Sequence, residues 1–182
     1  MKSLISRAAL GLTLACGAAQ AAGPLYLQDT SPPRPYVWDT SKGSIPVWTD
    51  GGGAFTYDFD GVTPFITIER ANEITQFAFD QWNKVPTATF QAGVAGTIKN
   101  KTGITDVTGA NAAQFYEKQN GYGFWVLYDT DGSILEEYFG VSRYAVLGIA
   151  FPEIADANGK ISEATALLNG WLVYDTDVNG DS

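Results

Sequence analysis

The stretch TIERANEITQFAFDQWNKVP, from Thr67 to Pro86, carries the strongest secondary-structure signal in the chain. Thr67 is a favoured N-cap residue, and Glu69 lies in the first turn, where the helix dipole favours negative charge. Apolar side chains recur at spacings of three and four residues along one face: Ile68, Ala71, Ile74, Ala78 and Trp82, widened by Phe77 and Phe79. Because Pro86 cannot continue a helix, the pattern predicts an amphipathic helix over residues 68–84. Its apolar face must be covered by another layer.

Short apolar runs on both sides of this helix predict β-strands. They are residues 44–49, 87–91, 122–128, 144–151 and 160–168, with a further candidate at 171–174. The run YGFWVLY at 122–128 is too short for a good helix and predicts a central strand buried on both faces. Residues 93–109 are polar and predict a long surface loop. The order of these elements predicts the α/β (α+β) class, with a long helix packed on a mixed twisted sheet.

Composition limits the chemistry that this chain can perform. Its 182 residues, 45% hydrophobic and 17% charged, suit one globular domain and exclude disorder and collagen-like repeats. The net charge of -9 argues against nucleic acid and anionic membranes as partners and favours divalent cations. The sequence has no His and one Cys, Cys16. A Ser-His-Asp triad, a Cys-His pair and a zinc site built on imidazole or thiolate are therefore excluded.

The first 21 residues have the pattern of a signal peptide. Lys2 and Arg7 supply the positive start, residues 8–19 form a short apolar run, and Ala19-Gln20-Ala21 is an A-x-A cleavage site. We expect cleavage after Ala21, a secreted or periplasmic mature chain and no membrane contact after cleavage. A membrane anchor is disfavoured because the run is too short to span about 30 Å of hydrocarbon. Lipidation at Cys16 is disfavoured because Thr13 stands where a lipobox normally has Leu.

The mature sequence divides into an arm and a domain. Residues 22–36 contain several prolines and predict an extended N-terminal arm. Residues 37–182 are expected to form one domain.

Several segments occur in an order that resembles a known family. They are IPVWT (45–49), AFDQWNKVP (78–86), Thr89-Phe90, VLYD (126–129) and LGIAFP (147–152). Together, over about residues 36–169, they resemble the N-terminal part of the catalytic domain of metzincins, the matrixin-like zinc metalloproteases. The resemblance implies a twisted sheet with helices, hydrolysis of peptide bonds, and a zinc ion held by a later helix with the motif H-E-x-x-H-x-x-G-x-x-H.

The chain departs from this family in its metal ligands. Without His it lacks the three zinc ligands, and Leu147 to Ala150 stand where matrixins carry a structural-zinc His. The resemblance therefore implies the N-terminal portion of a secreted zinc endopeptidase, inactive on its own, with zinc present only in a full-length relative. It also implies that residues 145–151 form the edge strand that pairs with a peptide substrate, through Gly148, Ile149 and Ala150.

Two acidic segments are candidate calcium sites. Asp129 and Asp131 follow the predicted central strand, where carboxylates and carbonyl oxygens can bind Ca²⁺; the alternative is an ordinary Asp-rich turn. Asp175, Asp177 and Asn179 match the first half of a calcium loop, whose twelfth position would lie beyond Ser182. The alternative there is a solvated acidic tail.

Other readings of the sequence lead to different functions. Glu136 and Glu137 are adjacent and point in different directions, which disfavours a glycosidase pair. Trp48, Trp125 and Trp171 could stack on sugars, although aromatic residues in apolar strands more often form the core. The main alternative to the protease is a secreted, non-enzymatic, calcium-dependent binding or adhesion domain. Substrate and oligomeric state are left open.

Overall fold

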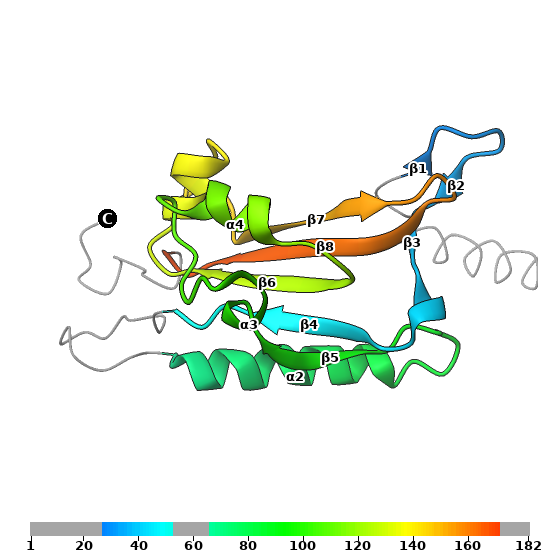
Figure 1. Cartoon of the computed structure of the whole chain (residues 1–182), viewed down its shortest axis with the longest axis horizontal. Helices are drawn as coiled ribbons and strands as arrows, with labels where there is room; N and C mark the ends of the chain where they lie inside the picture. The colour runs from blue at the N-terminus through cyan, green and yellow to red at the C-terminus, as the bar shows by residue number, and fades with distance from the viewer. Residues whose placement is uncertain (1–26, 53–65, 172–182) are drawn as a thin grey trace, which may run out of the picture. The chain divides into compact units, whose positions relative to one another are not determined.

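The computed structural model describes residues 27–52 and 66–171, which fall into two units divided after Tyr36 (Figure 1). In the first unit, β1 (Leu27–Gln28) and β2 (Arg34–Pro35) form a two-stranded antiparallel pair. This part of the predicted extended arm therefore folds back on itself. The signal peptide and its cleavage site at Ala21 lie outside the described residues, as does the rest of the arm.

The second unit is built on one sheet. Its main strands are β4 (Ile45–Thr49), β5 (Ala92–Thr97), β6 (Gly123–Asp129), β7 (Gly148–Ala155) and β8 (Lys160–Asn169). They lie in the order β5-β4-β6-β8-β7, and a short β3 (Val37–Trp38) pairs with the beginning of β8. All these pairs are parallel except β7 with β8. The predicted mixed α/β class is confirmed.

Strand β6 lies in the middle of the sheet, as its continuous apolar sequence predicts. It pairs with β4 on one side and, along its whole length, with β8 on the other. Trp125 and Leu127 are fully buried in the core on one face, while Val126 and Tyr128 belong to the core on the opposite face. Parallel strands are usually covered on both faces, which accounts for the unbroken hydrophobic run.

Helix α2 (Ile68–Asn83) covers one face of the sheet and ends one residue before the predicted end. The hydroxyl of Thr67 accepts a hydrogen bond from the Arg70 N–H, so the predicted N-cap is confirmed. The Thr75 hydroxyl lies 2.9 Å from the Tyr128 hydroxyl and joins the helix to β6. The expectation that the apolar stripe is covered is only partly met, because on α2 only Ala71 and Thr75 are buried.

The opposite face is covered by short helices that the sequence did not predict. They are α3 (Lys99–Thr102), α4 (Ala112–Lys118) and a π-helical segment (Ile134–Tyr138). Fully buried side chains in these segments, together with Ile98 at the N-cap of α3, pack with those of β6 and β8: Ile98, Phe115, Ile134 and Leu135 against Trp125, Leu127 and Leu167.

Two predicted strands differ from the structure. Residues 87–91 do not form a strand. The strand is β5 at Ala92–Thr97, which begins one residue before the predicted loop at 93–109 and occupies the first part of it. Pairing with β4 fixes this strand, from Ile45 opposite Ala92 onward. Strand β7 starts at Gly148, later than predicted, and continues past Pro152 to Ala155. Of the candidate at 171–174, only Trp171 is described, and it is not in a strand.

The Thr67 cap gives a testable prediction for the helix. Replacing Thr67 with Ala should lower the free energy of unfolding by about 1 kcal/mol, because the Arg70 N–H loses its acceptor at the helix start. Urea denaturation followed by circular dichroism measures the change. Thr87→Ala, at an exposed position in the turn after α2, is the control and should change stability by less than about 0.5 kcal/mol. Equal effects of the two substitutions would contradict the capping role.

Candidate functional site

Strand β7 forms one margin of the sheet. Gly148 lies opposite Leu168, Ile149 opposite Leu167 and Ala150 opposite Ala166, all in antiparallel register. In the described residues no strand pairs with the other side of β7 (Figure 1). The segment that the resemblance assigns to substrate binding is thus an open edge in this structure.

The register shows which backbone groups of β7 point outward. The Asn169 N–H donates to the Leu147 carbonyl at 2.9 Å, so positions 147, 149 and 151 face β8 because inward and outward groups alternate along an antiparallel strand. The N–H and C=O groups of Gly148 and Ala150 therefore point away from the sheet. Pro152 also occupies an outward-facing position, so the N–H that proline lacks would not have bonded to β8. The edge offers two N–H donors, followed by a position that cannot donate.

Local packing explains why Gly occupies position 148. A Cβ atom there would lie 2.4 Å from the Leu167 carbonyl oxygen, which is closer than any real side chain permits. Apolar side chains remain exposed beside this end of β7: Tyr144 is 69% and Leu147 79% exposed. An incoming strand would therefore meet apolar surface as well as backbone partners.

The first candidate calcium residues cap a turn. Asp129 is buried, and its two carboxylate oxygens accept hydrogen bonds from the Ile134 N–H at 3.0 Å and the Leu135 N–H at 2.9 Å. Asp131 accepts one from the Ser133 N–H at 2.9 Å. Burial raises the pKa of Asp129, and these two backbone donors counteract it. The bonds favour the turn interpretation, and calcium at Asp129 and Asp131 stays a prediction.

The remaining metal candidates are not brought together by the part of the chain that the structure describes. Within residues 27–52 and 66–171 there is no group of three or more His, Cys, Asp or Glu side chains placed to hold a metal ion. The second calcium candidate, formed by Asp175, Asp177 and Asn179, lies outside these residues.

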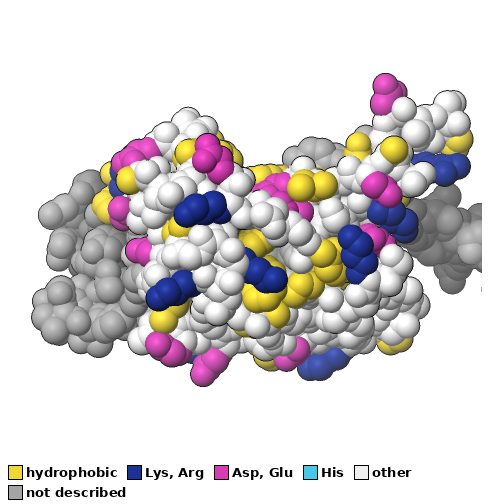
Figure 2. All heavy atoms as spheres, in the orientation of Figure 1, with side chains coloured by type: hydrophobic (Ala, Val, Ile, Leu, Met, Phe, Trp, Pro, Cys, Tyr) yellow, Lys and Arg dark blue, Asp and Glu magenta, His cyan; other side chains and the backbone are white. Residues whose placement is uncertain are grey.

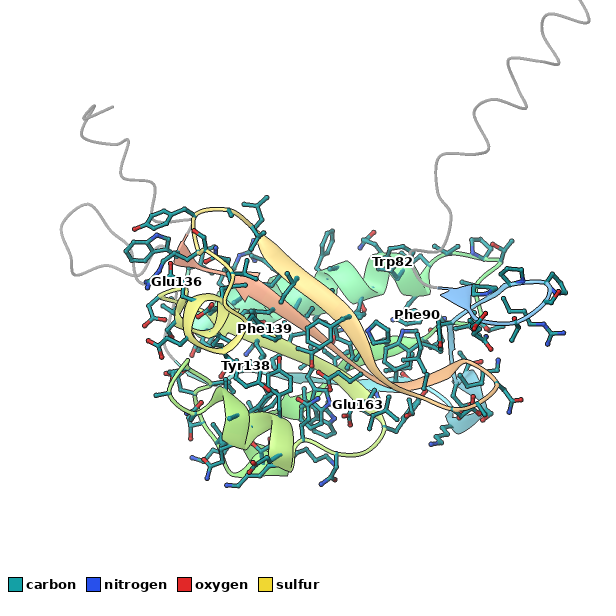
Figure 3. The ribbon with its side chains drawn as sticks, turned by 90° about the horizontal axis from the view of Figure 1, so that it is seen from above. Trp82, Phe90, Glu136, Tyr138, Phe139 and Glu163 are labelled. Atoms are coloured by element: carbon teal, nitrogen blue, oxygen red, sulfur yellow. The ribbon has the colours of Figure 1, made fainter. Side chains whose placement is uncertain are left out.

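Neither of the other sequence-based sites is assembled. Glu136 (Figure 3) forms a salt bridge with Arg143. The hydrogen bond between the two side chains lowers the pKa of the Glu136 carboxyl group. Trp125 is fully buried and belongs to the core, and Arg143 lies over the Trp171 ring at 4.9 Å. Trp48 packs beside Trp125 with ring centroids 6.4 Å apart. These contacts favour structural roles over sugar stacking.

An apolar groove lies between α2 and the sheet, and the sequence did not predict it. Its volume is about 580 Å³. Its walls come from α2, from the loop after it and from β3, β6 and β8, and include Trp38, Phe79, Trp82, Phe90, Phe124 and Leu168. Figure 3 shows Trp82 and Phe90 near one another beside the end of α2. A signal was present in the width of the apolar stripe on α2, where Phe77 and Trp82 stay more than half exposed.

None of the helices in the described residues is both long and apolar enough to cross a lipid bilayer. Comparison with known proteins found no matching family model, no matching curated protein and no matching solved structure.

Proposed function

We propose that this chain is the sheet-and-helix portion of a secreted, metzincin-like zinc endopeptidase, and that it binds an extended peptide substrate along β7. The observation that carries the proposal is the open edge of β7, where Gly148 and Ala150 present their N–H and C=O groups away from the sheet. A peptide that adds as a further strand pairs with these groups through main-chain hydrogen bonds. Exposed Leu147 and Tyr144 add apolar contact.

Cleavage is not assigned to these residues. A catalytic zinc ion would polarise the scissile carbonyl and lower the pKa of its bound water to about 7, but it needs neutral imidazole ligands. The 182 residues contain no His, so they do not fit a zinc site. We therefore expect the purified chain to bind peptide without hydrolysing casein or gelatin.

The groove beside α2 gives independent support. Within the described residues, the face formed by Phe124, Val126, Ala166 and Leu168 lines an open groove next to the helix, although mainly parallel sheets are usually covered by helices on both faces. Strand β8 ends at Asn169, immediately after Leu168 in the groove wall. A helix that followed β8, as the resemblance implies for the zinc-binding motif, would bury this surface.

A proline substitution tests the edge directly. Ala150→Pro removes the outward N–H of an exposed residue and leaves the bonds between β7 and β8 in place. We expect at least about a tenfold loss of affinity for capped octapeptides of apolar sequence, because a lost backbone bond and the added ring both oppose strand pairing. Amide chemical-shift titration measures the affinity, and the melting temperature should change by only a few degrees.

Ile149→Pro is the matched control, because the Ile149 N–H faces β8. Ile149→Pro should therefore lower the melting temperature, because it breaks a bond between β7 and β8, whereas Ala150→Pro should mainly lower the affinity for peptide. Peptide shifts that are equally large in the wild type and Ala150→Pro would contradict the proposal. For the protease assignment, any gene product that extends beyond Ser182 should hydrolyse casein in a chelator-sensitive way. The alternative, a calcium-dependent binding or adhesion domain, predicts no hydrolysis by that product.

A further inference from the structure

Two glutamates meet on the sheet face opposite α2. Glu163 in β8 (Figure 3) is only 2% exposed. Because alternate residues of a strand share a face, Glu163 lies on the same face as the core residue Leu167. The β7–β8 register shifts between Pro152 and Ile154, so Glu153 lies in a bulge beside Glu163. The two side chains therefore approach each other from neighbouring strands.

The carboxyl groups of Glu153 and Glu163 are hydrogen-bonded to each other. An ionised carboxylate only accepts hydrogen bonds, so this bond forms only when one of the two groups carries a proton. Neutral donors complete the cluster. Gln119 Nε2 donates to Glu163 Oε1 at 3.3 Å, and the Trp125 indole also bonds to Glu163. The Thr165 hydroxyl bonds to Glu153. These donors suit a pair that carries one negative charge.

The surroundings of the pair do not compensate a second negative charge. Within the described residues, neither glutamate forms a salt bridge. The titratable group that faces Glu153 from α4 is Tyr116, which stacks on Tyr138 with ring centroids 4.9 Å apart. Burial raises the pKa of Tyr116, so its phenol stays neutral. Glu117 and Lys118, the charged residues of α4, are exposed. Burial raises the pKa of both glutamates, so the folded pair keeps a proton at pH values where an exposed glutamate has lost it.

The end of β7 has few other attachments to the interior. Its pairing with β8 is regular as far as Pro152 and then shifts register on both sides of Ile154. Ile154 is 50% exposed, and Ala155 is exposed as well. Of residues 153–155, only Glu153 is partly buried. Segments with few buried contacts open locally at a low cost in free energy, so the glutamate pair decides whether this one stays closed.

We propose that Glu153 and Glu163 share one proton, and that loss of this proton releases residues 153–155 from β8. With the proton present, one carboxyl group donates to the other and the bulge stays closed. Figure 2 shows acidic side chains at the surface between α4 and β7, and the partly exposed Glu153 can pass the proton to water there. Two carboxylates then face each other in a site of low dielectric constant and repel. The end of β7 is therefore closed in acid and open at alkaline pH, whether or not the protein is part of a protease.

Amide hydrogen exchange measured by NMR at pH 5 and pH 8 tests this switch. After correction for the intrinsic effect of pH, the amides of residues 153–155 should exchange at least about tenfold faster at pH 8, because local opening exposes them. The amides of β6 report global unfolding and should change less. Glu153→Gln replaces the shared proton with a permanent N–H donor to Glu163, so the two rates should agree within about twofold. Glu117→Gln, an exposed substitution on α4 with the same charge change, should keep the wild-type pH dependence.

Three results would overturn the proposal. They are equal exchange of residues 153–155 at the two pH values in the wild type, an unchanged pH dependence in Glu153→Gln, and an acceleration at pH 8 that is as large in β6 as in β7. If Glu153→Gln does not fold, infrared spectroscopy of the Asp50→Asn protein provides a second test, because Asp50 then contributes no carboxyl signal. The carbonyl stretch of one protonated carboxyl group should be present at pH 6 and lost by pH 8. Its absence at pH 6 would exclude the shared proton.

Discussion

Replacing Asp129 with Ala should lower the free energy of unfolding by about 3 kcal/mol. Asp129 is 1% exposed, and its carboxylate accepts hydrogen bonds from the N–H groups of the fully buried residues Ile134 and Leu135. Without the carboxylate, both donors remain inside the protein without partners, at a cost of about 1–3 kcal/mol for each. The π-helical segment at Ile134–Tyr138 should loosen as well. Urea denaturation of both proteins measures the loss.

Asp131→Ala is the control for this prediction. Asp131 is exposed and caps the same turn through one bond to the Ser133 N–H, so its loss should cost less than about 1 kcal/mol. Equal destabilisation by the two substitutions would show that the buried position of Asp129 is unimportant. Melting both variants with and without millimolar Ca²⁺ also tests the calcium site predicted here, since a ligand that binds only the folded state raises stability.

The stability of the protein should fall as the pH rises from 4 toward 8. Burial raises the pKa of Asp50 to about 7, and the nearby Asp106 carboxylate adds to the shift from the ordinary value of 3.8. Between these values the folded state holds a proton that the unfolded chain has released, so raising the pH favours unfolding. A shift of about three units corresponds to at most about 4 kcal/mol. Denaturation at pH 5 and pH 8 measures the difference.

Asp50→Asn should remove most of this difference and stabilise the protein at pH 8. The Asn carbonyl keeps an acceptor for the Gly52 N–H, which lies 3.3 Å from Asp50 Oδ1. The amide cannot ionise. Glu153 and Glu163, whose pKa values are also raised, contribute with the same sign, so part of the slope should remain. A wild-type protein that is equally stable at pH 5 and pH 8 would show that Asp50 ionises normally in the fold.

The elements that could be predicted from the sequence have their secondary-structure signals in their own residues. Helix α2 has a cap at Thr67, a regular apolar stripe and a stop at Pro86, and β6 has a continuous hydrophobic run. Strand β5 has the sequence AGVAGT, whose small residues have little strand preference, and it forms because β4 is beside it. The turn at Asp129 could be anticipated from the sequence, but the π-helical segment that follows, whose Ile134 and Leu135 N–H groups donate to the Asp129 carboxylate, could not.

The candidate sites also divide into features with a local sequence signal and features that depend on packing. The position of the edge strand could be anticipated from the resemblance, but the direction of its N–H groups follows from pairing with β8. The meeting of Glu153 with Glu163 depends on a bulge and on α4, which are set by packing. One signal was available in the sequence of β8, because a buried strand reading KISEATALLN places an acid in an apolar run. A charged residue in such a run is rarely tolerated without a partner.

Pro152 has a consequence for how copies of this protein behave when they are concentrated. Open strand edges are the usual starting point of aggregation, because unpaired backbone groups on one molecule can join those on another. On β7 the outward donors end at Ala150, Pro152 offers none, and the bulge at Glu153 then breaks the regular register. Regular pairing with a long strand from a second molecule would therefore be interrupted beyond Ala150. We therefore expect this edge to be a poorer template for association between copies than a regular open strand of the same length.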